Sequence, residues 1–162
     1  MILAIGGNLA GDYPSLEALL EAALLELPRA GLRILRRSSW WRSSAWPDPT
    51  QPDYRNAVAL VETALAPRDI MAAALSIEAR FGRRREAPNA PRTVDIDFIA
   101  YGRAVIDEPG LILPHPRAHE RRFVVGPLAE IAPAWRHPTS GKTAAELAES
   151  AIIGADAVPA SP

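Results

Sequence analysis

Residues 93–101 alternate apolar and polar side chains, and this pattern constrains the fold more than any other part of the chain. A β-strand sends successive side chains to opposite faces of its sheet. The apolar members, which we expect to pack into the core, are Val94, Ile96 and Phe98. Asp95 and Asp97 then share the other face. The alternation therefore predicts a strand with one buried face and one face that carries two carboxylates.

The periodicity of the remaining chain predicts a mixture of helices and strands. Strand-like or extended segments are expected at residues 1–5, 32–41, 54–63, 93–101, 104–106 and 111–116. Helices are expected at residues 15–27, 67–81, 123–131 (interrupted at Pro127) and 144–150. Because these elements interleave without a regular βα repeat, the sequence indicates an α+β fold, with helices packed on a mainly antiparallel sheet.

One domain is expected over residues 1–153, and the small, Pro/Ala-rich residues 154–162 are expected to form a flexible C-terminal tail. The 162-residue chain has no cysteine, which excludes disulfides and thiolate metal sites and fits a reducing compartment. No basic leader or long apolar segment is present, so we expect a cytoplasmic protein without a membrane span.

The paired aspartates predict a site for a hard cation. Asp95 and Asp97 repel each other unless a cation joins them, and oxygen ligands suit Mg²⁺ better than zinc. Taken alone, the pair is also explained as the solvated face of an amphipathic strand. Arg92 and residues 83–85 precede the pair, and His115 and Arg121 follow it. Such arginines suit the phosphates of a nucleotide, which favours the cation interpretation.

Aromatic side chains gather around the first long loop, residues 43–53. The cluster consists of Trp40, Trp41, Trp46 and Tyr54. Tyr54 and Asn56 share one face of their expected strand, where an aromatic ring can stack on a flat heterocycle and an amide can pair with its edge. Trp40 and Trp41 are expected to serve packing.

The chain resembles the 6-hydroxymethyl-7,8-dihydropterin pyrophosphokinase family of folate biosynthesis. The resemblance lies in residues 4–9, 51–57, 78–85, 91–97, 114–117 and 120–124, in the family's order and spacing. It implies a ferredoxin-like sandwich and an enzyme that transfers diphosphate from ATP to the hydroxymethyl group of the pterin, giving AMP. It also implies two Mg²⁺ ions and direct attack of the substrate hydroxyl on the β-phosphorus.

The resemblance also implies roles for individual residues. Metal binding falls to Asp95 and Asp97, which with Arg85 and Arg92 form the expected catalytic set. Nucleotide binding is expected from Glu78, Arg85, Arg92, His115 and Arg121. Pterin binding is expected from Ser43, Tyr54, Asn56 and Phe123. The partners are then ATP and the pterin, with no nucleic acid or membrane, and we expect a monomer, with a dimer as the alternative.

Two other interpretations compete. A ferredoxin-like RNA-recognition module would use exposed aromatics and arginines, but it would need aromatics on the central strands, where this chain has carboxylates. A degenerate homologue would bind pterin or nucleotide without turnover, which the complete set of Arg92, Asp95, Asp97, His115 and Arg121 argues against.

Overall fold

The structure is a computed structural model that describes residues 1–45, 48–83 and 90–161. The first half contains β1 (Ile2–Gly7), α1 (Leu16–Arg29), β2 (Arg33–Arg37), β3 (Trp41–Ser43), β4 (Tyr54–Glu62) and α2 (Pro67–Arg80). The second half contains β5 (Asp95–Ala100), β6 (Ile106–Glu108), β7 (Leu111–Leu113), a 3₁₀ turn (Ala118–Glu120), α3 (Arg122–Ile131), α4 (Ala144–Ser150) and β8 (Val158–Pro159).

The main sheet is antiparallel in the described part of the chain. Its strand order is β5-β1-β4-β3-β8, with β2 also paired to β4, and β6 and β7 form a separate two-stranded ribbon. If β2 and β3 are taken as two segments along β4, the chain follows the β-α-β-β-α-β order of ferredoxin-like folds. The expected α+β sandwich is confirmed.

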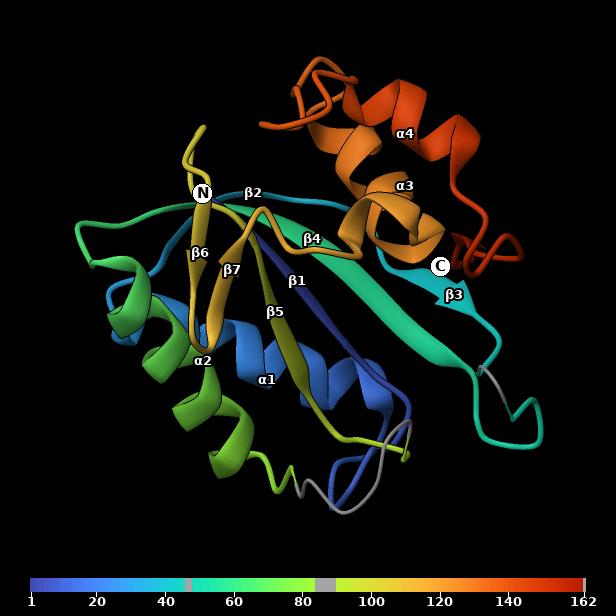
Figure 1. Cartoon of the computed structure of the whole chain (residues 1–162). Helices are drawn as coiled ribbons and strands as arrows, with labels where there is room; N and C mark the ends of the chain where they lie inside the picture. Colours follow the sequence, from blue (N-terminus) through green and yellow to red (C-terminus); the bar gives the residue numbers. More distant parts are fainter. Residues whose placement is uncertain (46–47, 84–89, 162) are drawn as a thin grey trace.

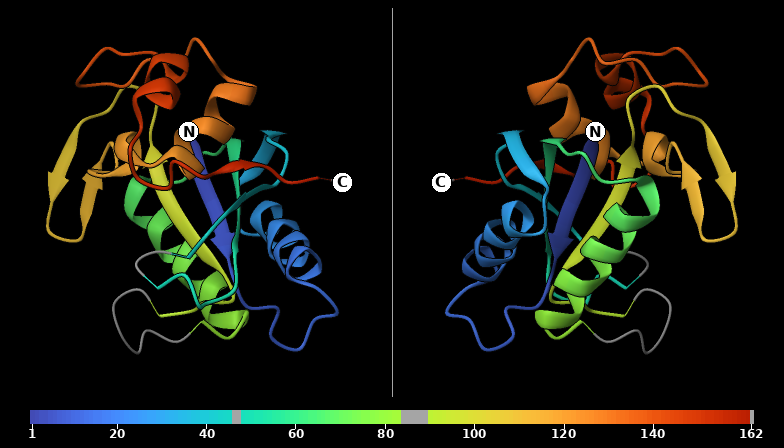
Figure 2. Two further views of the ribbon diagram at one scale, coloured as in Figure 1. Left: turned by 90° about the vertical axis from the view of Figure 1, so that its right-hand side faces the viewer. Right: turned by 90° about the vertical axis from the view of Figure 1, so that its left-hand side faces the viewer.

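The two faces of the sheet carry different helices. One face packs on α1 and α2, which lie together below the strands in Figure 1, and includes Ile96 and Phe98 of β5. The other face packs on α3 through residues such as Ile2, Val58 and Ile99, with α4 stacked on α3. Figure 2 shows α3 and α4 gathered at one end of the sheet. The predicted core positions Val94, Ile96 and Phe98 are at most 5% exposed.

The helices begin where the sequence predicts. Ser15 caps α1 by accepting a hydrogen bond from the Ala18 amide at 3.1 Å, and Pro67 is the first residue of α2. The capping box of Thr143 and Glu146 opens α4, which was expected at residues 144–150. None of the helices in the described residues is long and apolar enough to cross a membrane.

Three local expectations differ from the structure. The strand expected at 32–41 is broken into β2 and β3, because the Ser38 hydroxyl accepts the hydrogen bond from Val58 N that a continuous ladder would take. Helix α3 continues across Pro127, and α1 includes Pro28 before it ends at Arg29. The flexibility expected of residues 154–162 stays a prediction, and the structure places β8, within this segment, beside β3.

Candidate active site

The carboxylates of Asp95 and Asp97 lie on the part of the sheet that α3 leaves open. In the antiparallel register Asp95 is opposite Gly6 of β1 and Asp97 is opposite Ala4. Because these two neighbours are small, the sheet leaves space above them, and a cavity of about 410 Å³ lies there. The prediction that the two carboxylates share a face apart from the core is confirmed.

Arginines surround the two carboxylates. Arg92 Nη1 donates to Asp95 Oδ2 at 2.7 Å, and Arg83 forms ion pairs with both Asp95 and Glu78. Arg121 Nη1 lies 3.5 Å from Asp97 Oδ2. Burial, and after it the charge of Asp95, raises the pKa of Asp97 above its usual range in spite of the nearby cationic groups. The Asp97 carboxylate is therefore protonated more readily than an exposed aspartate.

A buried asparagine holds Arg92 in place. Asn8, 3% exposed, accepts a hydrogen bond from the Arg92 amide through Oδ1 at 2.8 Å. Its Nδ2 donates to the Pro52 carbonyl oxygen at 3.1 Å. Asn8 thus joins the end of β1 to the segments that precede β4 and β5. Asn8 was not among the predicted site residues, and the polar residue directly after the glycine pair was the available signal.

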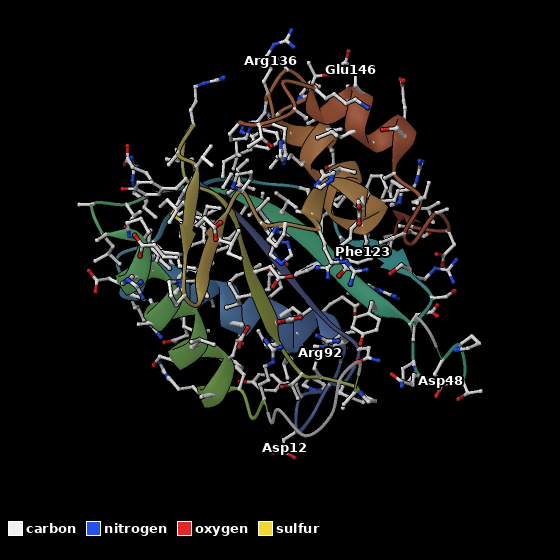
Figure 3. The ribbon with its side chains drawn as sticks, in the orientation of Figure 1. Asp12, Asp48, Arg92, Phe123, Arg136 and Glu146 are labelled. Atoms are coloured by element: carbon white, nitrogen blue, oxygen red, sulfur yellow. The ribbon has the colours of Figure 1, made fainter. Side chains whose placement is uncertain are left out.

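The aromatic and amide groups line another part of the cavity. Tyr54 and Asn56 of β4 both line it, as do Ser43 and Phe123. Asn56 Nδ2 donates to Ser43 Oγ at 3.3 Å, and the amide lies against Gly6, where a Cβ atom would come within 2.4 Å of Asn56 Oδ1. Figure 3 labels Arg92 and Phe123, which lie apart on the boundary of this cavity.

Two predicted nucleotide ligands do not line the cavity. Glu78 lies on the helix side of β5, 3% exposed, where its Oε1 accepts a hydrogen bond from Ile96 N at 2.7 Å. Glu78 also forms an ion pair with Arg83, and its expected nucleoside contact stays a prediction. His115 lies close enough to Asp97 for their charges to interact, and burial lowers the pKa of His115.

Arg85 and Trp46 lie outside the described residues. The residues that the structure does bring together around one cavity are Ser43, Tyr54, Asn56, Arg92, Asp95, Asp97, Arg121 and Phe123. Arg117, which was given no individual role from the sequence, and residues 153–156, which sequence reasoning missed, also line it. The last four gave no signal, because their small side chains resemble those of a frayed terminus.

Comparison with known proteins identifies the family of the chain. Residues 2–133 match the sequence model of the 7,8-dihydro-6-hydroxymethylpterin-pyrophosphokinase (HPPK) family. A Synechocystis 2-amino-4-hydroxy-6-hydroxymethyldihydropteridine pyrophosphokinase is 42% identical over 149 residues, which cover 91% of this chain and 74% of the relative. A Pseudomonas aeruginosa protein of the same name is 34% identical over 157 residues, covering 97% of this chain and 95% of the relative.

A solved structure supports the fold. A Plasmodium falciparum HPPK-DHPS chain superposes with a TM-score of 0.70 over 91% of this chain, at 14% sequence identity. At that identity the likeness shows the fold alone. The matched region is 43% of the solved chain, so the present chain spans less than half the length of that protein.

Proposed function

We propose that this chain, which belongs to the 7,8-dihydro-6-hydroxymethylpterin-pyrophosphokinase family, works with two Mg²⁺ ions held by Asp95 and Asp97. Its reaction transfers pyrophosphate from ATP to hydroxymethyldihydropterin in folate biosynthesis. The observation that carries this proposal is the pair of carboxylates on the floor of a cavity whose other charged groups include Arg92 and Arg121.

The donor set fits magnesium. Asp95 and Asp97 offer only carboxylate oxygens, which are hard ligands. In the described residues no group of three or more histidine, cysteine, aspartate or glutamate side chains is placed to hold a metal. This donor set suits an ion that keeps several waters and takes further ligands from substrate phosphates. Bound there, Mg²⁺ would neutralise phosphate charge and help orient the reacting oxygens.

The cationic side chains are proposed to bind the triphosphate. Arg92 and Arg121 both line the cavity and can each present several N–H donors to phosphate oxygens. His115 and Arg85 complete the proposed set. Charge develops on the bridging oxygen as its bond to the β-phosphorus breaks, and fixed guanidinium groups stabilise that charge without reorganising.

The part of the cavity that Tyr54 and Phe123 line is proposed to bind the pterin. Tyr54 and Phe123 offer aromatic faces for the heterocycle, and Asn56 and Ser43 offer polar groups to its edge. The substrate hydroxyl would then lie near the phosphates and attack the β-phosphorus directly, with AMP as the leaving group. No covalent enzyme intermediate is needed, because positioning and charge supply the catalysis.

The groups on the open face favour this activity over RNA recognition. Carboxylates at Asp95 and Asp97 would repel a nucleic-acid backbone.

We also propose a cytoplasmic location, which the cysteine-free sequence fits because the cytoplasm is reducing. We further propose a monomer, which size-exclusion chromatography with light scattering would test.

The test is an assay of AMP formation from ATP and the pterin. We expect activity to depend on Mg²⁺, to be lost in EDTA, and to fall by at least about 100-fold in Asp97→Ala, since metal ligation is worth several kcal/mol. Asp107→Ala, which removes an exposed carboxylate on β6, is the matched control and should retain activity. Equal AMP formation with and without EDTA, or full activity in Asp97→Ala, would refute the metal proposal. Tight RNA retention in filter binding without AMP formation would favour the binding module.

A further inference from the structure

The C-terminal segment runs along the wall of the cavity instead of leaving the fold. Ile153 N donates to the Glu120 carbonyl oxygen at 3.0 Å, and Arg122 N donates to the Ile153 carbonyl oxygen at 2.8 Å. Further on, β8 pairs with β3, and Ala160 N donates to the Trp40 carbonyl oxygen at 2.8 Å. We call residues 153–160 the C-terminal strap. It follows residue 133, where the match to the family model ends.

The strap contacts the aromatic ring of Phe123 at a glycine. Gly154 has a φ angle of +65°, and a Cβ atom built on it would lie 2.6 Å from Phe123 Cδ1 and 3.2 Å from Cε1. The ring therefore packs directly on the Gly154 backbone, in a conformation that residues with side chains rarely adopt. This contact fixes the direction in which Phe123 faces the cavity.

The strap also holds the loop that follows β3. Asp156 Oδ2 accepts a hydrogen bond from the Ser44 amide at 2.6 Å, and this bond lowers the pKa of Asp156. Ser44 and its neighbours Ser43 and Ala45 line the cavity. A charged acceptor on a backbone amide is among the stronger hydrogen bonds in proteins. Asp156 therefore sets the position of a second part of the cavity wall.

A partly buried arginine anchors the strap itself. Arg122, the first residue of α3, donates through Nε to the Ala157 carbonyl oxygen at 3.3 Å and through Nη1 to the Ala148 carbonyl oxygen at 3.1 Å. Ala157 is fully buried. The strap is thereby fixed to the residue next to Phe123, so its position and that of the ring are linked.

We propose that Gly154 and Asp156 are positioning residues for the pterin, which they serve by holding Phe123 and the Ser43–Ala45 loop. The inference rests on the proposed function, in which the pterin binds beside Phe123 and Ser43. Both contacts are distant in sequence from Arg92, Asp95 and Asp97, and neither strap residue bonds to those side chains in any interaction that the structure shows. Arg121 lies beside Phe123, with its guanidinium carbon 5.9 Å from the ring centre, so changes in the strap should weaken pterin binding more than nucleotide binding.

The experiment measures pterin and nucleotide affinity separately by calorimetry on the full chain, with a non-hydrolysable ATP analogue and Mg²⁺. Asp156→Ala should raise the pterin Kd by about tenfold, because it removes one charge-assisted hydrogen bond, with the nucleotide Kd within about twofold. Asp156→Asn should restore most of the affinity, since its amide oxygen still accepts from Ser44 N. Gly154→Ala should weaken pterin binding at least as much.

Ile152→Ala is the matched control, because Ile152 precedes the strap and is 80% exposed. It should bind both ligands like the unmodified chain. A pterin Kd of Asp156→Ala within about twofold of the unmodified chain would overturn the inference, as would equal loss of both ligands or no rescue in Asp156→Asn. If Gly154→Ala does not fold, the two Asp156 variants decide the matter. Failure of the unmodified chain to bind pterin would instead refute the proposed function.

Discussion

Replacing Asn8 by alanine removes two hydrogen bonds that join three separate segments of the chain. Oδ1 accepts from Arg92 N at 2.8 Å, and Nδ2 donates to the Pro52 carbonyl oxygen at 3.1 Å. A buried hydrogen bond contributes about 0.5–1.5 kcal/mol, and leaving its partner unsatisfied costs more. Since Asn8 is 3% exposed, water cannot readily replace the lost partner. We expect Asn8→Ala to lower the free energy of unfolding by about 2 kcal/mol.

The same substitution should reduce activity through Arg92. The side chain of Arg92 pairs with Asp95, and its backbone position depends on Asn8. A shift of the order of 1 Å in a positioned group can cost about 100-fold in rate. Urea unfolding would measure the stability, and AMP formation would measure kcat/KM.

Asn8→Asp separates the two bonds. A carboxylate can still accept from Arg92 N, but it cannot donate to the Pro52 carbonyl oxygen. We expect this variant to keep more activity than Asn8→Ala although it is also destabilised. A stability change below about 0.5 kcal/mol in Asn8→Ala, with activity unchanged, would show that the Asn8 bonds do not hold Arg92 in solution.

Substitutions at two buried titratable residues, Glu78 and His137, give two further predictions. Glu78→Ala should lower the free energy of unfolding by about 3 kcal/mol, because it removes a buried partner of Arg83 and the acceptor of Ile96 N. Glu78→Gln keeps an acceptor and should lose less stability. Urea unfolding of the two variants checks this order. Burial, and after it the charge of His119, lowers the pKa of His137 below its ordinary value of 6.5, so the unfolded chain binds a proton more readily than the folded one. The free energy of unfolding should therefore fall as the pH drops through about 6.5, and it should fall less steeply in His137→Gln. Identical pH profiles of unfolding for the unmodified chain and His137→Gln would show that His137 does not cause this pH dependence.

Local patterns predicted the features that depend on local periodicity. The alternation at residues 93–101 placed Asp95 and Asp97 on one face because the two-residue repeat of a strand does not depend on the rest of the fold. The caps at Ser15 and Thr143 were predictable for the same reason, since each bonds to an amide three residues away.

Features that depend on distant contacts could not be predicted in this way. Asn8 and Arg92 are 84 positions apart, and only the pairing of β1 with β5 brings their segments together. The position of Glu78 depends on which face α2 covers, and that is decided by tertiary packing. The sequence of the strap, residues 153–160, is equally compatible with a disordered terminus, and its partners at Ser44 and Phe123 appear only in the fold.

The guanidinium groups paired with Asp95 and Asp97 have a consequence for how ligands enter the cavity. Without ligand, the protein balances its two carboxylates with its own Arg83, Arg92 and Arg121. A cation that binds the carboxylates alone would displace these arginines and leave them without a counter-charge. An anion that binds the arginines alone would leave the carboxylates without theirs. A cation and an anion that arrive together exchange partners with both sets at once, so the local charge stays near zero. The cavity therefore favours a preformed neutralised complex over either free ion.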